Sequence, residues 1–257
     1  MSKEFSLLGV VHLLALPGTP YGHVSLETIR DRAFHDAEVI LEAGFSGCVL
    51  ENFGDVPFSA GAVQPHIVAC MTWIASGLRE RFGQDFMLGI NVLRNDPQAA
   101  LAIAYAAHAN FIRVNVHIGA AWTDQGLIQG KAYETLLYRR MLAAQNISIA
   151  ADVLVKHAHP AGGTDLVLLG KDTFLRGGAD MLILTGSQTG SQTSPEAVLQ
   201  LREALPQAPI WIGSGVTPHN IAQYRENATG AIIGTYLHEK GDLARPLSAK
   251  RAGAFFV

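Results

Sequence analysis

Short, almost wholly apolar runs alternate with longer amphipathic stretches from one end of the 257-residue chain to the other. Runs that are apolar at nearly every position are typical of parallel strands with both faces covered. Each stretch between them carries apolar residues at helical spacing, as residues 25–43 show clearly. This alternation predicts an α/β fold built from repeated strand-helix units.

The predicted strands number eight, at residues 7–13, 47–51, 86–92, 111–116, 147–155, 181–184, 210–212 and 231–233. Predicted helices lie between them at residues 25–43, 64–82, 97–108, 132–145, 165–176, 195–205 and 218–225. No Pro-, Gly- or Ser-rich linker divides the series. The pattern favours a single (β/α)8 TIM barrel domain over residues 1–257 rather than a doubly wound sheet.

Composition excludes several classes of protein. Hydrophobic residues make up 49% and charged residues 16% of the chain, against about 25% charged in an average soluble protein, so disorder is excluded. The net charge of −3 and the absence of a Lys/Arg stripe argue against a nucleic-acid partner. No apolar stretch approaches the roughly 20 residues of a transmembrane segment, and no signal peptide precedes the first strand, so we expect a cytoplasmic protein.

Polar residues gather where the predicted strands end, and the active site of a barrel lies at those ends. Strand side chains alternate between two faces, so Arg113 and Asn115 are expected to point into the barrel. The candidate substrate-binding residues at the ends of the first four strands are His12, Asn91, Arg113 and Asn115.

The fifth strand places Asp152 and Lys156 on one face, with His157 beside them. A desolvated lysine can serve as a base or as a Schiff-base nucleophile, and histidine shuttles protons. Together with Glu51, which ends an apolar strand and needs a partner or a metal, these are the candidate catalytic residues. The alternatives are an Asp152–Lys156 ion pair that closes the barrel, and a Glu51 on a solvated rim.

Two glycine-containing turns end the last two strands, Gly213-Ser214-Gly215 before a predicted helix from about residue 217, and Gly234-Thr235. Glycines let backbone N–H groups approach an anion, and barrels often hold phosphate between these loops. We therefore expect a phosphate site here, although ordinary tight turns have the same glycines. Thr185, in the loop after the sixth strand, is a further candidate contact.

Residues 119–131 form a longer loop than such connections usually have. A lid is one explanation, with Asp124 and Gln125 as candidate substrate contacts. Known nucleotide and hydrolase motifs are missing: residues 126–131 fall one residue short of a P-loop, and neither G-x-G-x-x-G after a strand, nor H-E-x-x-H, nor G-x-S-x-G occurs.

The chain resembles the BtpA family, which includes the SgcQ-like proteins. The matching segments are residues 12–13, 16–18, 51–58 (ENFGDVPF), 89–96 (GINVLRND), 113–115, 123–126 (TDQG), 151–157 (ADVLVKH) and 213–215. Residues 14–15 are Leu-Ala where many members have prolines. The resemblance implies a phosphate-binding TIM barrel whose polar positions coincide with the strand-end residues named above.

The resemblance implies two kinds of function. Members in nonphotosynthetic bacteria are similar to enzymes of carbohydrate or nucleoside-sugar catabolism, and the cyanobacterial namesake is associated with photosystem I accumulation. Our first hypothesis is an isomerase, aldolase or other lyase acting on a small phosphorylated sugar or nucleoside-derived sugar phosphate, and the second is a non-catalytic assembly or regulatory factor.

The third hypothesis is a metal-dependent hydrolase or nucleoside triphosphatase, in which Glu51, Asp152 and His12 would gather a divalent ion. No cofactor other than such a metal is expected. The low charge of the predicted helices further predicts a homo-oligomer.

Overall fold

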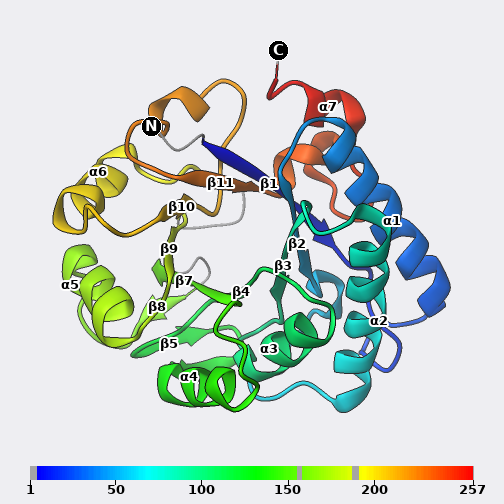
Figure 1. The fold of residues 1–257 in the computed structure, drawn as a ribbon, viewed down its shortest axis with the longest axis horizontal. Coiled ribbons are helices and arrows are strands. Elements are labelled where there is room, and N and C mark those ends of the chain that lie inside the picture. The colour runs from blue at the N-terminus through cyan, green and yellow to red at the C-terminus, as the bar shows by residue number, and fades with distance from the viewer. Residues whose placement is uncertain (1–4, 155–157, 187–190, 257) are drawn as a thin grey trace.

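The eight predicted strands pair side by side in the computed structural model, which describes residues 5–154, 158–186 and 191–256. All neighbours are parallel, and the sheet closes in the order β1-β11-β10-β9-β7-β4-β3-β2 (Figure 1). The barrel strands are β1 (Ser6–His12), β2 (Gly47–Glu51), β3 (Met87–Asn91), β4 (Phe111–Val114), β7 (Ser148–Leu154), β9 (Met181–Leu184), β10 (Ile210–Ile212) and β11 (Gly230–Ile233). The predicted TIM barrel is confirmed.

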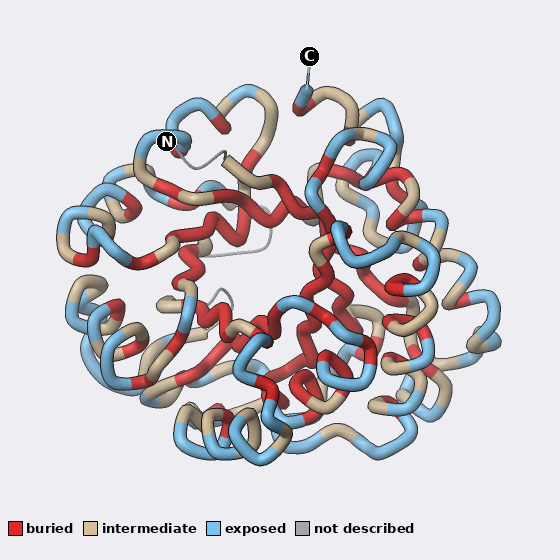
Figure 2. The backbone as a smooth tube through the Cα atoms, viewed as in Figure 1, coloured by how far each residue is buried: buried red, intermediate tan, exposed pale blue. Residues whose placement is uncertain are grey.

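Helices cover the outside of the barrel, so that the strands lie in a buried ring inside an exposed one (Figure 2). They are α1 (Leu26–Glu42), α2 (Pro65–Phe82), α3 (Pro97–Ala106), α4 (Ala132–Met141), α5 (Leu166–Lys171), α6 (Pro195–Ala204) and α7 (Ala249–Gly253). Helix α3 begins where the sequence dictates: the Asp96 side chain accepts the N–H of Ala99, and Pro97 occupies the first turn. No helix in the described ranges is both long and apolar enough to cross a membrane.

The barrel interior has an apolar floor and a polar mouth. Met87 of β3 packs against a buried cluster that fills the floor with side chains from the other seven strands: Leu8, Val10, Val49, Phe111, Ala150, Ile183, Trp211 and Ile232. Strand side chains alternate with a period of two, so the same face carries polar side chains two residues further along β1, β2, β4 and β7. They are His12, Glu51, Arg113 and Asp152, whereas β10 and β11 are followed at that point by Gly213 and Gly234. The polar residues therefore lie together at the carboxyl ends of the strands.

The predicted loop of residues 119–131 is folded rather than irregular. It forms a hairpin of β5 (Ala120–Thr123) and β6 (Gly126–Gln129), to which β8 (His159–Pro160) adds a third antiparallel strand. Its turn consists of Asp124 and Gln125, the two residues expected to contact substrate.

The predicted helix at residues 218–225 was wrong. Only a short 3-10 turn, Ile221–Gln223, forms there. The Asn220 side chain explains the difference, because its Oδ1 accepts the N–H of Thr217 and its Nδ2 donates to the carbonyl of Gly215. Such local side-chain bonds compete with helix formation, and the loop after β10 therefore lacks the helix N-terminus expected beside the anion. Strand β4 also ends at Val114, two residues earlier than expected.

Candidate functional site

The carboxyl ends of five adjacent strands bring polar side chains to one place. Their register makes neighbours of His12 and Glu51, of Glu51 and Asn91, and of Asn91 and Arg113. These four side chains and Asp152 are each less than a tenth exposed. The structure therefore brings together five of the residues that the sequence nominated from strand ends.

Asp152 is the counter-ion of Arg113. Its carboxylate accepts Nε and Nη2 of Arg113, each at 3.1 Å, and Nδ2 of Asn115, also at 3.1 Å. Burial acts to lower the pKa of Arg113, but the charges of Asp152 and Glu51 outweigh it and raise that pKa above its ordinary value. The guanidinium is thus a fixed positive charge at the mouth of the barrel.

Two asparagine amides present acceptors to the interior. Asn91 Nδ2 donates to Glu51 Oε2 at 2.6 Å, and Asn115 Nδ2 donates to Asp152. Because a carboxylate only accepts, each amide oxygen must face away from its carboxylate partner. Neither Oδ1 finds a hydrogen-bond partner among the described residues, although both are buried.

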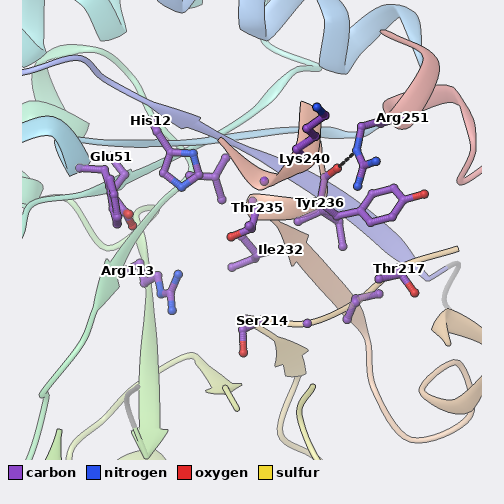
Figure 3. Close-up of a pocket in the computed structure, with 18 residues that line it drawn as sticks. His12, Glu51, Arg113, Ser214, Thr217, Ile232, Thr235, Tyr236, Lys240 and Arg251 are labelled. Carbon is purple, nitrogen blue, oxygen red and sulfur yellow. Dashed lines mark hydrogen bonds between the residues drawn. The ribbon is translucent and has the colours of Figure 1, made fainter. Parts of the chain in front are cut away.

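A cavity of about 310 Å³ opens beside these residues, between the loops that follow β10 and β11 (Figure 3). His12, Glu51 and Arg113 line one side of it, and the segments 213–217 and 234–236 line the other. Both predicted glycine turns therefore border one cavity.

Glycine is required at both ends of the first turn. A Cβ on Gly213 would lie 2.6 Å from Ile183 Cγ2, and Gly215 has φ +72° with Ser191 O only 2.2 Å from an added Cβ. The hydroxyl of Ser214 is used within the loops: it accepts the N–H of Gly186 at 2.7 Å and donates to Ser191 O at 3.1 Å. Ser214 therefore fixes the turn, and the backbone is the part left to meet a ligand.

Two cations that sequence analysis missed, Lys240 and Arg251, line the same cavity. Figure 3 shows both beside Thr235 and Tyr236. Arg251 Nε donates to the carbonyl of Tyr236, and the guanidinium stacks 4.2 Å from the centre of the Tyr236 ring. In the described part of the chain neither cation forms an ion pair with a carboxylate. They belong to the segment after β11, where the sequence shows no hydrophobic periodicity that would predict the direction of their side chains.

A second histidine, His238, also escaped notice. It is fully buried behind the cavity, and its Nε2 lies 3.2 Å from Nδ1 of His12. Burial lowers the pKa of His238, because the charged form would lose its hydration.

Other predicted site residues lie elsewhere or outside the described structure. Lys156 and His157 fall outside the described residues. Thr185 Oγ1 donates to the carbonyl of Leu154 at 2.9 Å and so holds two strand ends together. Asp124 lies exposed at the hairpin turn and does not line the cavity.

The expected metal ligands do not form a cluster. His12 and Glu51 line the cavity, whereas Asp152 is bound to Arg113 and Asn115. Across the described ranges no group of three or more His, Cys, Asp and Glu side chains could hold an ion. A site made of these three residues therefore has no support in the geometry.

Comparisons with known proteins agree with this architecture. An uncharacterized protein of Pyrococcus abyssi is 43% identical over 246 residues, covering 96% of this chain and 92% of that protein. The photosystem I biogenesis protein BtpA of Synechocystis is 42% identical over 249 residues, covering 97% of this chain and 86% of that one. Among solved structures, phosphoribosyl anthranilate isomerase from Thermus thermophilus superposes with a TM-score of 0.59 at 12% identity, over 98% of this chain and 96% of that one.

The last of these likenesses shows the fold alone, whereas the first two extend over nearly the whole sequence at a much higher identity. The family model described as the BtpA family matches residues 3–257. With that match and relatives above 40% identity over almost the entire length, this chain belongs to the BtpA family.

Proposed function

We propose that the protein is an enzyme that binds a small phosphorylated sugar, or a nucleoside-derived sugar phosphate, at the mouth of the barrel. The observation that carries the proposal is the division of one cavity into two parts. Lys240 and Arg251 lie beside Tyr236 at one end, and His12, Glu51 and Arg113 lie at the other. The glycine turns adjoin the second group as well, since a Cβ on Gly213 would lie 3.3 Å from Arg113 Nη2 and one on Gly234 would lie 3.1 Å from His12 Cε1. A phosphate needs the first environment, and the reacting part of a sugar needs the second.

The phosphate end combines backbone and charge. Glycines at 213, 215 and 234 keep side chains from covering the backbone, so that N–H groups can meet a phosphate closely. Lys240 and Arg251 then supply charge-assisted hydrogen bonds, which contribute about 1.5–3 kcal/mol each. The binding role of this end does not depend on a helix dipole, since the segment directly after β10 forms only the 3-10 turn Ile221–Gln223.

The sugar end provides groups for hydroxyl and carbonyl oxygens. Arg113, held by Asp152, lines the cavity and would polarise a carbonyl. Glu51 accepts a hydrogen bond from Asn91 and lines the cavity. It is the carboxylate we assign to proton transfer, while Asp152 orients Arg113.

The reaction class we propose is isomerase, aldolase or another lyase, in each of which a positioned side chain can transfer a proton to or from the substrate. In the aldolase form Lys156 would attack the substrate carbonyl to give a Schiff base, with loss of water. Borohydride added with the substrate should then trap a covalent adduct at Lys156. An enzyme that consumes the substrate yet stays unmodified would remove the Schiff-base form and leave the isomerase form.

A thermal-shift screen tests binding directly. A ligand at about 100 times its dissociation constant adds about 2.7 kcal/mol, which raises the Tm of a chain of this length by about 5–10 °C. We expect sugar phosphates to give such shifts and neutral sugars to give none. Lys240→Ala and Arg251→Ala should abolish most of the shift, and Lys250→Ala, which removes an exposed charge next to Arg251, should keep it. Absence of a shift with every phosphorylated compound would overturn the proposal.

A second candidate function is a non-catalytic assembly factor, favoured by the 42% identity to the photosystem I biogenesis protein of Synechocystis. The two functions differ in what the cavity does. Under the assembly hypothesis, Glu51→Gln and Arg113→Met variants that fold normally would retain full activity in cells. Loss of cellular activity in these variants at normal protein level favours the enzyme.

A further inference from the structure

His12 and His238 form a buried pair that joins the first barrel strand to the segment after the last one. The two residues are 226 positions apart, and His12 Nδ1 lies 3.2 Å from His238 Nε2. His238 is fully buried, whereas His12 is 8% exposed and lines the cavity. One member of the pair can therefore meet a ligand, and the other cannot.

The direction of the hydrogen bond between them follows from a third partner. His238 Nδ1 lies 2.8 Å from the carbonyl oxygen of Arg245. A carbonyl only accepts, so His238 must carry a proton on Nδ1. In neutral His238 the other nitrogen, Nε2, then holds the lone pair and must accept from His12 Nδ1. Neutral His12 is left with its lone pair on Nε2.

The alternative is a charged His238 that donates from both nitrogens. Burial opposes the charge and lowers the pKa of this residue, with the nearby Arg32 acting in the same direction. The hydrogen bond to the Arg245 carbonyl, Asp36 and Asp242 act the other way, but the net shift of the pKa remains downward. His238 is accordingly neutral at physiological pH.

A second set of hydrogen bonds holds the Arg245 carbonyl, to which His238 donates. Arg32 donates to the carbonyls of Ala244 and Arg245, and its Nε is paired with Asp36 at 2.8 Å. Asp36 also accepts the N–H of Leu247 at 2.9 Å. Helix α1 thereby holds the loop of residues 244–247 in place, and that loop orients the ring of His238.

We propose that His238 is a positioning residue that sets the tautomer of His12, so that His12 directs the lone pair of Nε2 to the cavity as a second proton acceptor beside Glu51. The ring edge of His12 faces Gly234: a Cβ at that position would lie 3.1 Å from Cε1 and 3.4 Å from Nε2. A larger residue than glycine there would press on that edge.

The role of His12 in a reaction rests on the proposed function. A proton from a substrate carbon or hydroxyl would pass to Nε2, giving an imidazolium whose Nδ1–H remains bonded to His238, and would return from Nε2 to the product. No other co-reactant is needed. The tautomer itself requires no substrate and can be tested without one.

The experiment is 15N NMR of histidine-labelled full-length protein at about pH 8, well above the ordinary histidine pKa of about 6.5. Long-range 1H–15N correlations distinguish a protonated ring nitrogen from a lone-pair nitrogen, and a His12→Asn sample assigns the His12 signals. We expect Nδ1 of His12 to be protonated and Nε2 to be the lone-pair nitrogen. An Nε2–H tautomer in the native protein would overturn the proposal.

Two variants separate positioning from simple packing. In His238→Gln the side-chain oxygen can still accept from His12, so the tautomer should persist. In His238→Asn the shorter amide still reaches Arg245 but not His12, so His12 should become a mixture of both tautomers. His219→Asn, at an exposed position, is the control and should leave the His12 signals unchanged. A pure Nδ1–H tautomer in a folded His238→Asn protein would contradict the assignment.

Addition of inorganic phosphate and then of ribose 5-phosphate to the same samples distinguishes this proposal from the proposed function. If the His12 tautomer is as expected and neither compound shifts the signals of His12, which lines the cavity, the positioning role stands and the phosphate site fails. If ribose 5-phosphate binds but His12 carries its proton on Nε2, the reverse holds.

Discussion

Replacement of Asp152 by alanine should strongly destabilise the fold. The side chain of Asp152 is completely buried and that of Arg113 is 3% exposed, so the variant leaves a guanidinium inside the barrel without its carboxylate. Asn115 loses an acceptor as well. Breaking a buried pair by removal of one partner costs about 3–5 kcal/mol, which lowers the Tm of a chain of this length by about 6–20 °C.

Urea unfolding followed by circular dichroism measures this loss. The matched control is Asp172→Ala, because Asp172 and Arg176 form an exposed pair 3.9 Å apart, and its removal should change the free energy of unfolding by less than about 0.5 kcal/mol. The double variant with Arg113→Met and Asp152→Leu should be more stable than Asp152→Ala, since no buried charge remains unpaired. A loss below about 1 kcal/mol for Asp152→Ala would refute the view that this pair is a buried, fixed charge.

Three further predictions concern the turn, the pH dependence and the assembly. Gly215→Ala should destabilise the protein by about 1–3 kcal/mol and weaken phosphate binding. The reason is that φ at this position is +72° and the new Cβ would clash with Ser191. Unchanged unfolding and binding curves would count against this prediction. His117 and His238 both have pKa values lowered by burial. Below about pH 6.5 the unfolded chain therefore binds more protons than the folded one, and the free energy of unfolding should fall as the pH falls. The decrease is at most about 1.4 kcal/mol per pH unit per histidine. Their contribution is fully present above that pH, and urea midpoints that stay level from about pH 7.5 to about 5.5 would contradict the assignment. Light scattering should give the mass of more than one chain, because α4 exposes apolar side chains on one face; a monomer would contradict this prediction. The exposed side chains on that face are Tyr133, Leu137 and Met141.

The barrel could be predicted from sequence because its strands are buried on both faces and so are apolar at nearly every position. The same regularity located the polar mouth: in β4, alternation alone places Arg113 on the face of Phe111, which lies inside the barrel. The carboxyl ends of parallel strands meet at one edge. Residues such as Glu51 and Asn91 could therefore be nominated together without knowledge of any contact.

The remaining features depend on contacts between distant or aperiodic segments. Lys240 comes from a short 3-10 turn and Arg251 from the five-residue helix α7, both after the last strand and too short to show a hydrophobic period. The pairing of His12 with His238 depends on barrel closure, which brings the two ends of the chain together. The segment directly after β10 does not form the predicted helix because the Asn220 side chain bonds to the loop. Helix propensities do not predict such bonds.

The central claim is that Lys240 and Arg251 bind the phosphate of a small phosphorylated sugar. Calorimetric titration of ribose 5-phosphate at fixed ionic strength tests it most directly, with the native protein, the double variant Lys240→Ala/Arg251→Ala and the control Lys250→Ala. Loss of two charge-assisted bonds of about 1.5–3 kcal/mol each should weaken binding by at least about 100-fold, while the control binds as the native protein does. Equal affinity in the double variant, or no heat of binding in the native protein, would contradict the account.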